Sequence, residues 1–183
     1  MMYLDKVQLL FTSSTDGTMR VWRIDQARQL LLYPWFVIFQ TVQEFPSARP
    51  GQQPNVWLTC FDCKQGESLQ VFAGDSEGSM YIFEALETWR EEKDCLFRLH
   101  TKQDLIHRIG VIQVLLVVQE NLIFTISYDQ TLKWFEATEK ERATHNELSN
   151  PNKTVFTCLC WDYQEQELYA ADEKGYIFVI NVY

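Results

Sequence analysis

The chain has 183 residues, a formal net charge of −9 and a pI of about 4.8, with 46% hydrophobic residues. That length fits one domain with a substantial core, and the acidic balance argues against general binding to nucleic-acid phosphates. No run approaches the ~20 apolar residues of a membrane-spanning helix, and the first residues lack a signal-peptide pattern.

Four segments share one pattern of strand, tight turn and strand. They cover residues 9–22, 69–83, 122–135 and 168–180. Their aligned turn residues are Gly17, Gly78, Gln130 and Gly175, a spacing close to the ~40–50-residue period of propeller blades, with insertions in the first two intervals. Each copy is apolar at alternate positions and again on the opposite face. Such a unit must stack on its neighbours to bury both faces, so the sequence predicts a repeat protein.

The first repeat is predicted to contain a truncated inner strand, a hairpin with its turn at Gly17, and an outer strand. Residues 3–6 indicate the end of an inner strand, so we expect this blade to be cut short. A two-residue turn at Gly17 follows, because glycine readily adopts the positive φ that such a turn requires. Residues 30–39 predict an outer strand running into a connector. The Pro and Gly content of residues 45–54 is typical of a surface loop.

The second and third repeats each begin with an inner strand, predicted at residues 56–61 and 111–116. Residues 84–94 are acidic and favour a short helix, before an outer strand at residues 95–100. In the third repeat, Gln130 occupies the glycine position. We expect its turn to be longer or strained, because glutamine fits a left-handed conformation poorly. Residues 137–152 are charged and then rich in Asn and Pro, which predicts a mobile loop.

The fourth repeat has an inner strand at residues 155–160, and its third strand is followed by no fourth. The prediction is therefore an all-β chain, a partial β-propeller of about four four-stranded antiparallel blades with the first and last incomplete. The approximate blades are residues 1–45, 55–100, 110–145 and 154–183.

The motifs resemble those of the WD-repeat β-propellers. Asp16, Gly17 and Trp22 match the turn and third strand of that family, and His107 stands four residues before an inner strand. Ser127 and Asp129 match the turn region of the same blade. The Trp-Asp ending of the family is intact in no copy, so its His–Ser–Asp–Trp network is expected to be incomplete in every blade. Blade stacking is then expected to supply most of the stability.

The resemblance also implies a count of blades. Propellers of this family usually have seven, and this chain supplies at most four. We therefore expect half of a larger propeller, completed either by more of the same protein or by a neighbouring subunit. A compact four-bladed ring is the alternative. An open stack exposes two blade faces and a strand edge, so the segment alone is expected to be poorly soluble.

Chemical motifs are scarce. The odd count of five cysteines favours reduced thiols in an intracellular compartment. A zinc site is the alternative for the paired cysteines, which are Cys60, Cys63, Cys158 and Cys160. Buried thiols are the commoner role for such residues. The histidines His100, His107 and His145 are spread over three predicted connectors, whereas a catalytic triad needs a histidine beside a nucleophile and an orienting acid. We expect neither metal nor cofactor, and no enzymatic activity.

The sequence therefore favours a non-enzymatic scaffold or adaptor that binds other proteins in a larger assembly. The candidate partner-binding residues lie in turns and connectors, namely Asp16, Glu77, Asp129, His107, Trp35 and Trp89. The acidic turns favour a basic partner. Two alternatives remain, a reader of a modified or basic peptide and an enzyme with its site in the propeller channel. Loose similarity to cytoskeletal and axonemal WD-repeat proteins suggests a cytoplasmic placement, at the cytoskeleton or the ciliary axoneme.

Overall fold

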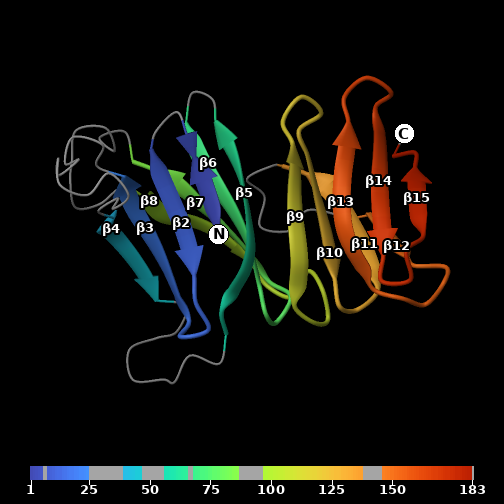
Figure 1. Cartoon of the computed structure of the whole chain (residues 1–183), viewed down its shortest axis with the longest axis horizontal. Coiled ribbons are helices and arrows are strands. Elements are labelled where there is room, and N and C mark those ends of the chain that lie inside the picture. Colours follow the sequence, from blue (N-terminus) through green and yellow to red (C-terminus); the bar gives the residue numbers. More distant parts are fainter. Residues whose placement is uncertain are drawn as a thin grey trace, which may run out of the picture. The chain divides into compact units, whose positions relative to one another are not determined.

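The computed structural model describes residues 1–5, 8–24, 39–46, 56–65, 68–86, 97–137 and 146–182. The chain divides into two compact units, Met1–Leu58 with Ala85–Arg98 and Thr59–Glu84 with Leu99–Tyr183. The secondary-structure elements of the described residues are all β-strands, and they form four separate sheets (Figure 1).

The first unit contains one four-stranded sheet. Its strands in spatial order are β1 (Met2–Leu4), β2 (Leu9–Ser13), β3 (Thr18–Ile24) and β4 (Phe39–Pro46). The inner strand β1 is short, as the sequence predicts. Strand β4 begins where the predicted outer strand was expected to end, and its last residues enter the predicted loop at 45–54. The rest of those two predicted segments, residues 30–38 and 47–54, lies outside the described residues.

Three further sheets follow along the chain, with their strands paired in sequence order. The second sheet contains β5 (Leu58–Gln65), β6 (Leu69–Asp75), β7 (Met80–Ala85) and β8 (Phe97–Gln103). The third contains β9 (Val111–Val117), β10 (Leu122–Ser127), β11 (Thr131–Glu136) and β12 (Asn146–Ser149). The fourth contains β13 (Phe156–Asp162), β14 (Glu167–Asp172) and β15 (Ile177–Ile180).

Strand β12 corrects the prediction of a mobile loop over residues 137–152. It pairs with β11 in register, and Leu148 lies opposite Leu132 and packs against the core. Most side chains of β12 face solvent and are polar. The composition of the segment therefore does not reveal that one residue, Leu148, packs against the core. The helix expected over residues 84–94 falls largely outside the described residues, and β7 extends to Ala85.

The four hairpin turns share one geometry. At the first, the Ser14 N–H donates to Thr18 O and the Gly17 N–H donates to Ser14 O, so the loop holds three residues rather than the predicted two. Gly17 has a φ of 80°. Gln130 takes the same place with a φ of 68° and the same bond to a residue three back, so the third turn is not lengthened.

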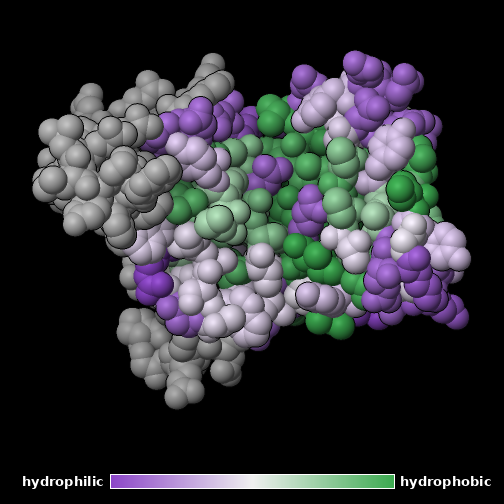
Figure 2. All heavy atoms as spheres, in the orientation of Figure 1, coloured by the Kyte–Doolittle hydropathy of each residue, from purple (hydrophilic) through white to green (hydrophobic). Residues whose placement is uncertain are grey.

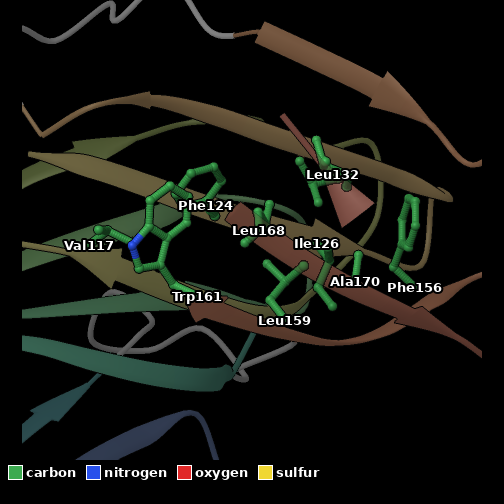
Figure 3. Close-up of a cluster of buried hydrophobic side chains, with 10 residues drawn as sticks. Val117, Phe124, Ile126, Leu132, Phe156, Leu159, Trp161, Leu168 and Ala170 are labelled. Atoms are coloured by element: carbon green, nitrogen blue, oxygen red, sulfur yellow. The ribbon is translucent and has the colours of Figure 1, made fainter. Parts of the chain in front are cut away.

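In the second unit, successive sheets pack face to face. Phe124 of β10 and Leu132 of β11 are fully buried against the β13–β15 sheet, and the Phe124 ring stacks on Trp161 at 5.6 Å between centroids (Figure 3). The same positions of the second sheet, which include Phe72 and Met80, pack against the third. The third sheet therefore uses one face for the sheet before it and the other for the sheet after it, as the repeat pattern predicts.

Candidate interaction surface

An aspartate closes each of the four turns. In the first and third turns the aspartate directly precedes the residue with positive φ. Its carboxylate accepts the backbone N–H of the residue that comes after the positive-φ residue. Asp16 accepts from Thr18 at 2.9 Å, and Asp129 accepts from Thr131 at 3.0 Å. The Thr18 hydroxyl and N–H, both donated to the Asp16 carboxylate, lower the pKa of Asp16 to about 2.

In the second and fourth turns the aspartate stands two positions earlier. Asp75 Oδ1 accepts the Ser79 N–H at 2.7 Å, and Asp172 Oδ1 accepts the Tyr176 N–H at 3.0 Å. Alignment on the glycine places Glu77 at the acidic position of the second turn. The closing carboxylate is the buried Asp75 instead, and Glu77 is exposed.

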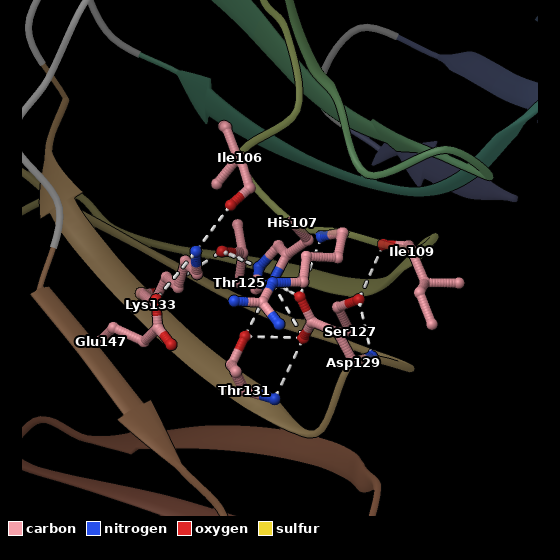
Figure 4. Close-up of polar contacts among 10 residues, drawn as sticks. Ile106, His107, Ile109, Thr125, Ser127, Asp129, Thr131, Lys133 and Glu147 are labelled. Carbon is pink, nitrogen blue, oxygen red and sulfur yellow. Dashed lines mark hydrogen bonds and ion pairs between the residues drawn. The ribbon is translucent and has the colours of Figure 1, made fainter.

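The third sheet contains a buried polar network centred on His107 (Figure 4). His107 Nδ1 lies 3.2 Å from Asp129 Oδ2, and His107 Nε2 lies 2.8 Å from the Thr125 hydroxyl. Because a carboxylate can only accept, Nδ1 carries the proton and Nε2 accepts the Thr125 hydroxyl hydrogen. Asp129 also accepts the Arg108 N–H and both donors of Thr131. The side chain of His107 is 0% exposed and that of Asp129 is 5% exposed.

Burial sets the charge of this pair. Removal from water lowers the pKa of His107 and outweighs the nearby Asp129 carboxylate, which acts in the opposite direction. Burial acts to raise the pKa of Asp129, but the Thr131 hydroxyl, the Arg108 N–H and His107 together bring that pKa below its ordinary value. The network therefore joins a neutral imidazole to a carboxylate near neutral pH.

Acidification is expected to destabilise the second unit through His107. The unfolded histidine takes up a proton near pH 6.5 and the folded one only at lower pH. Its contribution is present in full above 6.5 and is lost as the pH falls through the folded pKa. Urea denaturation at pH 7.5 and 5.5 should show a loss of stability, at most about 1.4 kcal/mol from this one group, that the His107→Gln variant does not show. An equal pH slope in that variant would contradict the assignment.

Thr125 was not identified from the sequence. It stands five residues before the turn residue Gln130, and Thr12 stands five residues before Gly17. In the first sheet, Trp22 Nε1 donates to the Thr12 hydroxyl at 2.7 Å. The third sheet thus has the imidazole, carboxylate and hydroxyl, with Phe135 at the tryptophan position, whereas the first has the tryptophan and the hydroxyl. The threonine repeated five residues before the turn residue was the sequence signal that could have identified Thr125.

The hydroxyl, imidazole and carboxylate follow the order of a hydrolase triad. Thr125 is 0% exposed and His107 is 1% exposed, so the hydroxyl is inaccessible to a substrate in the folded structure. The arrangement fixes the loop that carries His107. Lys133 reinforces it by donating to Ile106 O at 2.8 Å while pairing with Glu147.

Hydrogen bonds join the turns and connectors at one end of the second unit into a continuous rim, defined here as residues 75–79, 104–110, 127–131, 150–155 and 172–176. The His107 N–H donates to Gly78 O, and the Tyr128 N–H donates to Gly110 O. The Asn150 N–H donates to Gln130 O. The last link is the Thr154 hydroxyl, which donates to Asp172 at 2.6 Å. The rim is therefore a rigid surface.

Large apolar side chains project from this rim into solvent. They are Leu105 (70% exposed), Ile109 (50%), Tyr128 (58%) and Tyr176 (57%). The exposed charges of the rim are mixed. The acids are Glu77, Asp104 and Glu173, and the bases are Arg108, Lys153 and Lys174. The described rim therefore has no acidic excess that would favour a basic partner.

The predicted site residues are distributed unevenly. The rim contains Glu77, His107 and Asp129, but the last two are buried within it. Asp16 is exposed on the turn of the first unit. Trp35 and Trp89 lie outside the described residues. The rim's exposed apolar residues were not recognised in the sequence, because single leucines and tyrosines in loops resemble ordinary turn flanks.

The paired cysteines lie on two strands, Cys60 and Cys63 on β5 and Cys158 and Cys160 on β13. Among the described residues, no group of three or more His, Cys, Asp or Glu side chains is placed to hold a metal ion. Within the same residues, no helix is long and apolar enough to cross a membrane.

Neither a protein-family model nor a curated protein matches the sequence. Among solved structures, the chain is similar to the C-terminal WD40 domain of Sif2, with a TM-score of 0.62 and 11% identity over 95% of this chain. The chain has the WD40 fold. The predicted all-β, partial-propeller architecture is thereby confirmed at the level of fold. The chain spans 54% of the length of the Sif2 chain, so it carries about half of a WD40 fold of that size.

Proposed function

We propose that this chain is a non-enzymatic protein-interaction scaffold, and that the rim of its second unit is the docking surface. The observation that carries the proposal is the combination of a hydrogen-bonded, rigid rim with four exposed apolar side chains. A rigid surface loses little conformational entropy on binding, so more of the contact energy appears as affinity. The WD40 fold supports a general role in binding proteins.

The partner favoured by this rim is a protein segment that offers apolar or aromatic side chains. Tyrosine is enriched among the residues that dominate interface energetics, because it combines a large apolar ring with a hydroxyl. The mixed charges around Tyr128 and Tyr176 resemble the polar border of an interface and provide no strong selection for a basic chain. A reader of basic peptides is therefore the weaker alternative.

A matched pair of tyrosine variants tests this surface. Tyr128 on the rim is 58% exposed, and Tyr163 in the β13–β14 turn at the opposite end of the sheets is 56% exposed. Proteins cross-linked to the wild-type chain in cells should be recovered with Tyr163→Ala and reduced at least roughly tenfold with Tyr128→Ala, a loss of about 1.4 kcal/mol or more in binding. Equal recovery with both variants would refute docking at the rim.

An enzymatic alternative finds no support in the Thr125–His107–Asp129 network, because its hydroxyl is fully buried. The adaptor role in a larger assembly, and a cytoplasmic placement at the cytoskeleton or axoneme, belong to the same proposal. Imaging of the tagged protein tests the placement independently of the docking surface.

A further inference from the structure

One face of the β13–β15 sheet is apolar and uncovered. Its residues form two cross-strand rows, which are Cys158–Ala171–Ile177 and Cys160–Tyr169–Val179. Ile177 is 70% exposed and Val179 is 56% exposed, and both cysteines are exposed. Hydrophobic atoms reach the surface beside β14 and β15 (Figure 2). Apolar rows of this length on a sheet face normally pack against another element.

The same positions are covered in the two preceding sheets. Tyr169 stands six residues before its turn residue Gly175, as Phe124 and Phe72 do before Gln130 and Gly78. Phe124 is buried under the fourth sheet and Phe72 under the third. The exposed face is therefore built as a sheet-to-sheet contact, and no described strand of this unit covers it. The outer edge of β15 likewise has no paired strand among the described residues.

Each sheet that covers the face of the sheet before it makes the contact with an equivalent cross-strand row of residues. In the third sheet it is Leu116–Ile123–Phe135, and in the fourth it is Trp161–Leu168–Ile180. Both rows are buried against the sheet before them. The first sheet has the same row, Tyr3–Leu10–Trp22. There Tyr3 is 44% exposed, and Leu10 and Trp22 are half-buried. This chain thus presents both the uncovered face and a partly exposed row of the type that covers such faces.

We propose that the β13–β15 face is covered by the first sheet of a second copy of this chain. The contact is head-to-tail, because the two copies use different surfaces, and such contacts repeat until a ring closes. The chain spans 54% of the Sif2 WD40 chain, so two copies together span about the length of one such chain. This contact uses a different surface from the rim.

Thiol reactivity reports directly on this face. Cys158 and Cys160 should react quickly with iodoacetamide in dilute wild-type protein. At a total concentration about a hundred times the dissociation constant they should react roughly tenfold more slowly, because only the uncovered chain reacts. Cys60 and Cys63, whose thiol pKa values are raised by burial in β5, serve as internal references in the same mass-spectrometric measurement.

A matched pair of valine variants separates this contact from others. Val179→Lys places a charge on the face, and Val118→Lys places one in the β9–β10 turn, where the valine is 43% exposed. Sedimentation should show that the wild type and Val118→Lys self-associate and that Val179→Lys is monomeric. In Val179→Lys, Cys158 and Cys160 should react with iodoacetamide equally fast at every protein concentration.

Three results would overturn the proposal. Self-association that survives Val179→Lys would assign it to another surface. Thiols in the wild type that react freely at all concentrations would indicate a face left open or reserved for another protein. Slow reaction of Cys158 and Cys160 that does not change on dilution would indicate that another part of the same polypeptide covers the face.

Discussion

Replacing Asp129 with alanine is expected to lower the free energy of unfolding by about 3 kcal/mol, because the change leaves several buried donors without an acceptor. The carboxylate accepts from His107 Nδ1, from the Arg108 N–H and from the N–H and hydroxyl of Thr131. With the side chain of His107 fully buried, water cannot replace the lost acceptor without opening the connector. Urea denaturation followed by tryptophan fluorescence measures the loss.

Asp104 provides the control. It pairs with Lys102 at 2.6 Å, but its side chain is 70% exposed, so Asp104→Ala should cost less than about 1 kcal/mol. A double-mutant cycle adds specificity. Asp129→Ala and His107→Ala should combine with a coupling of about 1–2 kcal/mol, because each removes the other's partner. A cost for Asp129→Ala no larger than that for Asp104→Ala would show that water solvates the Asp129 carboxylate.

The polar network and the turns also show how far sequence alone reaches. Strand positions and the stacking of sheets follow from alternating apolar residues, because each face of a sheet must be buried by a neighbour. The network in the third sheet was only partly predictable. His107 and Asp129 match the spacing of the WD-repeat motif. Thr125 provides the hydroxyl from inside a strand, where a single threonine has no sequence pattern that marks its role.

Features that depend on three-dimensional contacts, and not on the repeat alignment, were harder to predict. Asp75 closes its turn from two positions earlier than the aligned Glu77, because an aspartate at either place can reach the same backbone N–H. Strand β12 was hidden because only Leu148 of its four residues packs against the core. Exposure is also invisible in the sequence. Val179 and Ile82 occupy the same repeat position, yet one is 56% exposed and the other 5%.

The largest effect of a single methyl group is expected at Gly78. Its φ of 96° is strained for any residue with a Cβ, and an added Cβ would lie 2.3 Å from His107 O and 2.8 Å from Ile109 O. These are backbone atoms of the rim, so no flexible side chain can move aside. Gly78→Ala is expected to cost about 4 kcal/mol, from left-handed strain together with displacement of the connector.

Gly175 isolates the backbone part of that cost. It occupies the same turn position with a φ of 85°, and an added Cβ meets no atom within 4 Å. Gly175→Ala should therefore cost about 1–2 kcal/mol, the left-handed penalty alone. Hydrogen exchange of the His107 N–H, which donates to Gly78 O at 2.9 Å, should accelerate in Gly78→Ala and stay unchanged in Gly175→Ala. Equal costs for the two variants would mean that the connector yields freely, and the rim would then be too soft to act as a preformed docking surface.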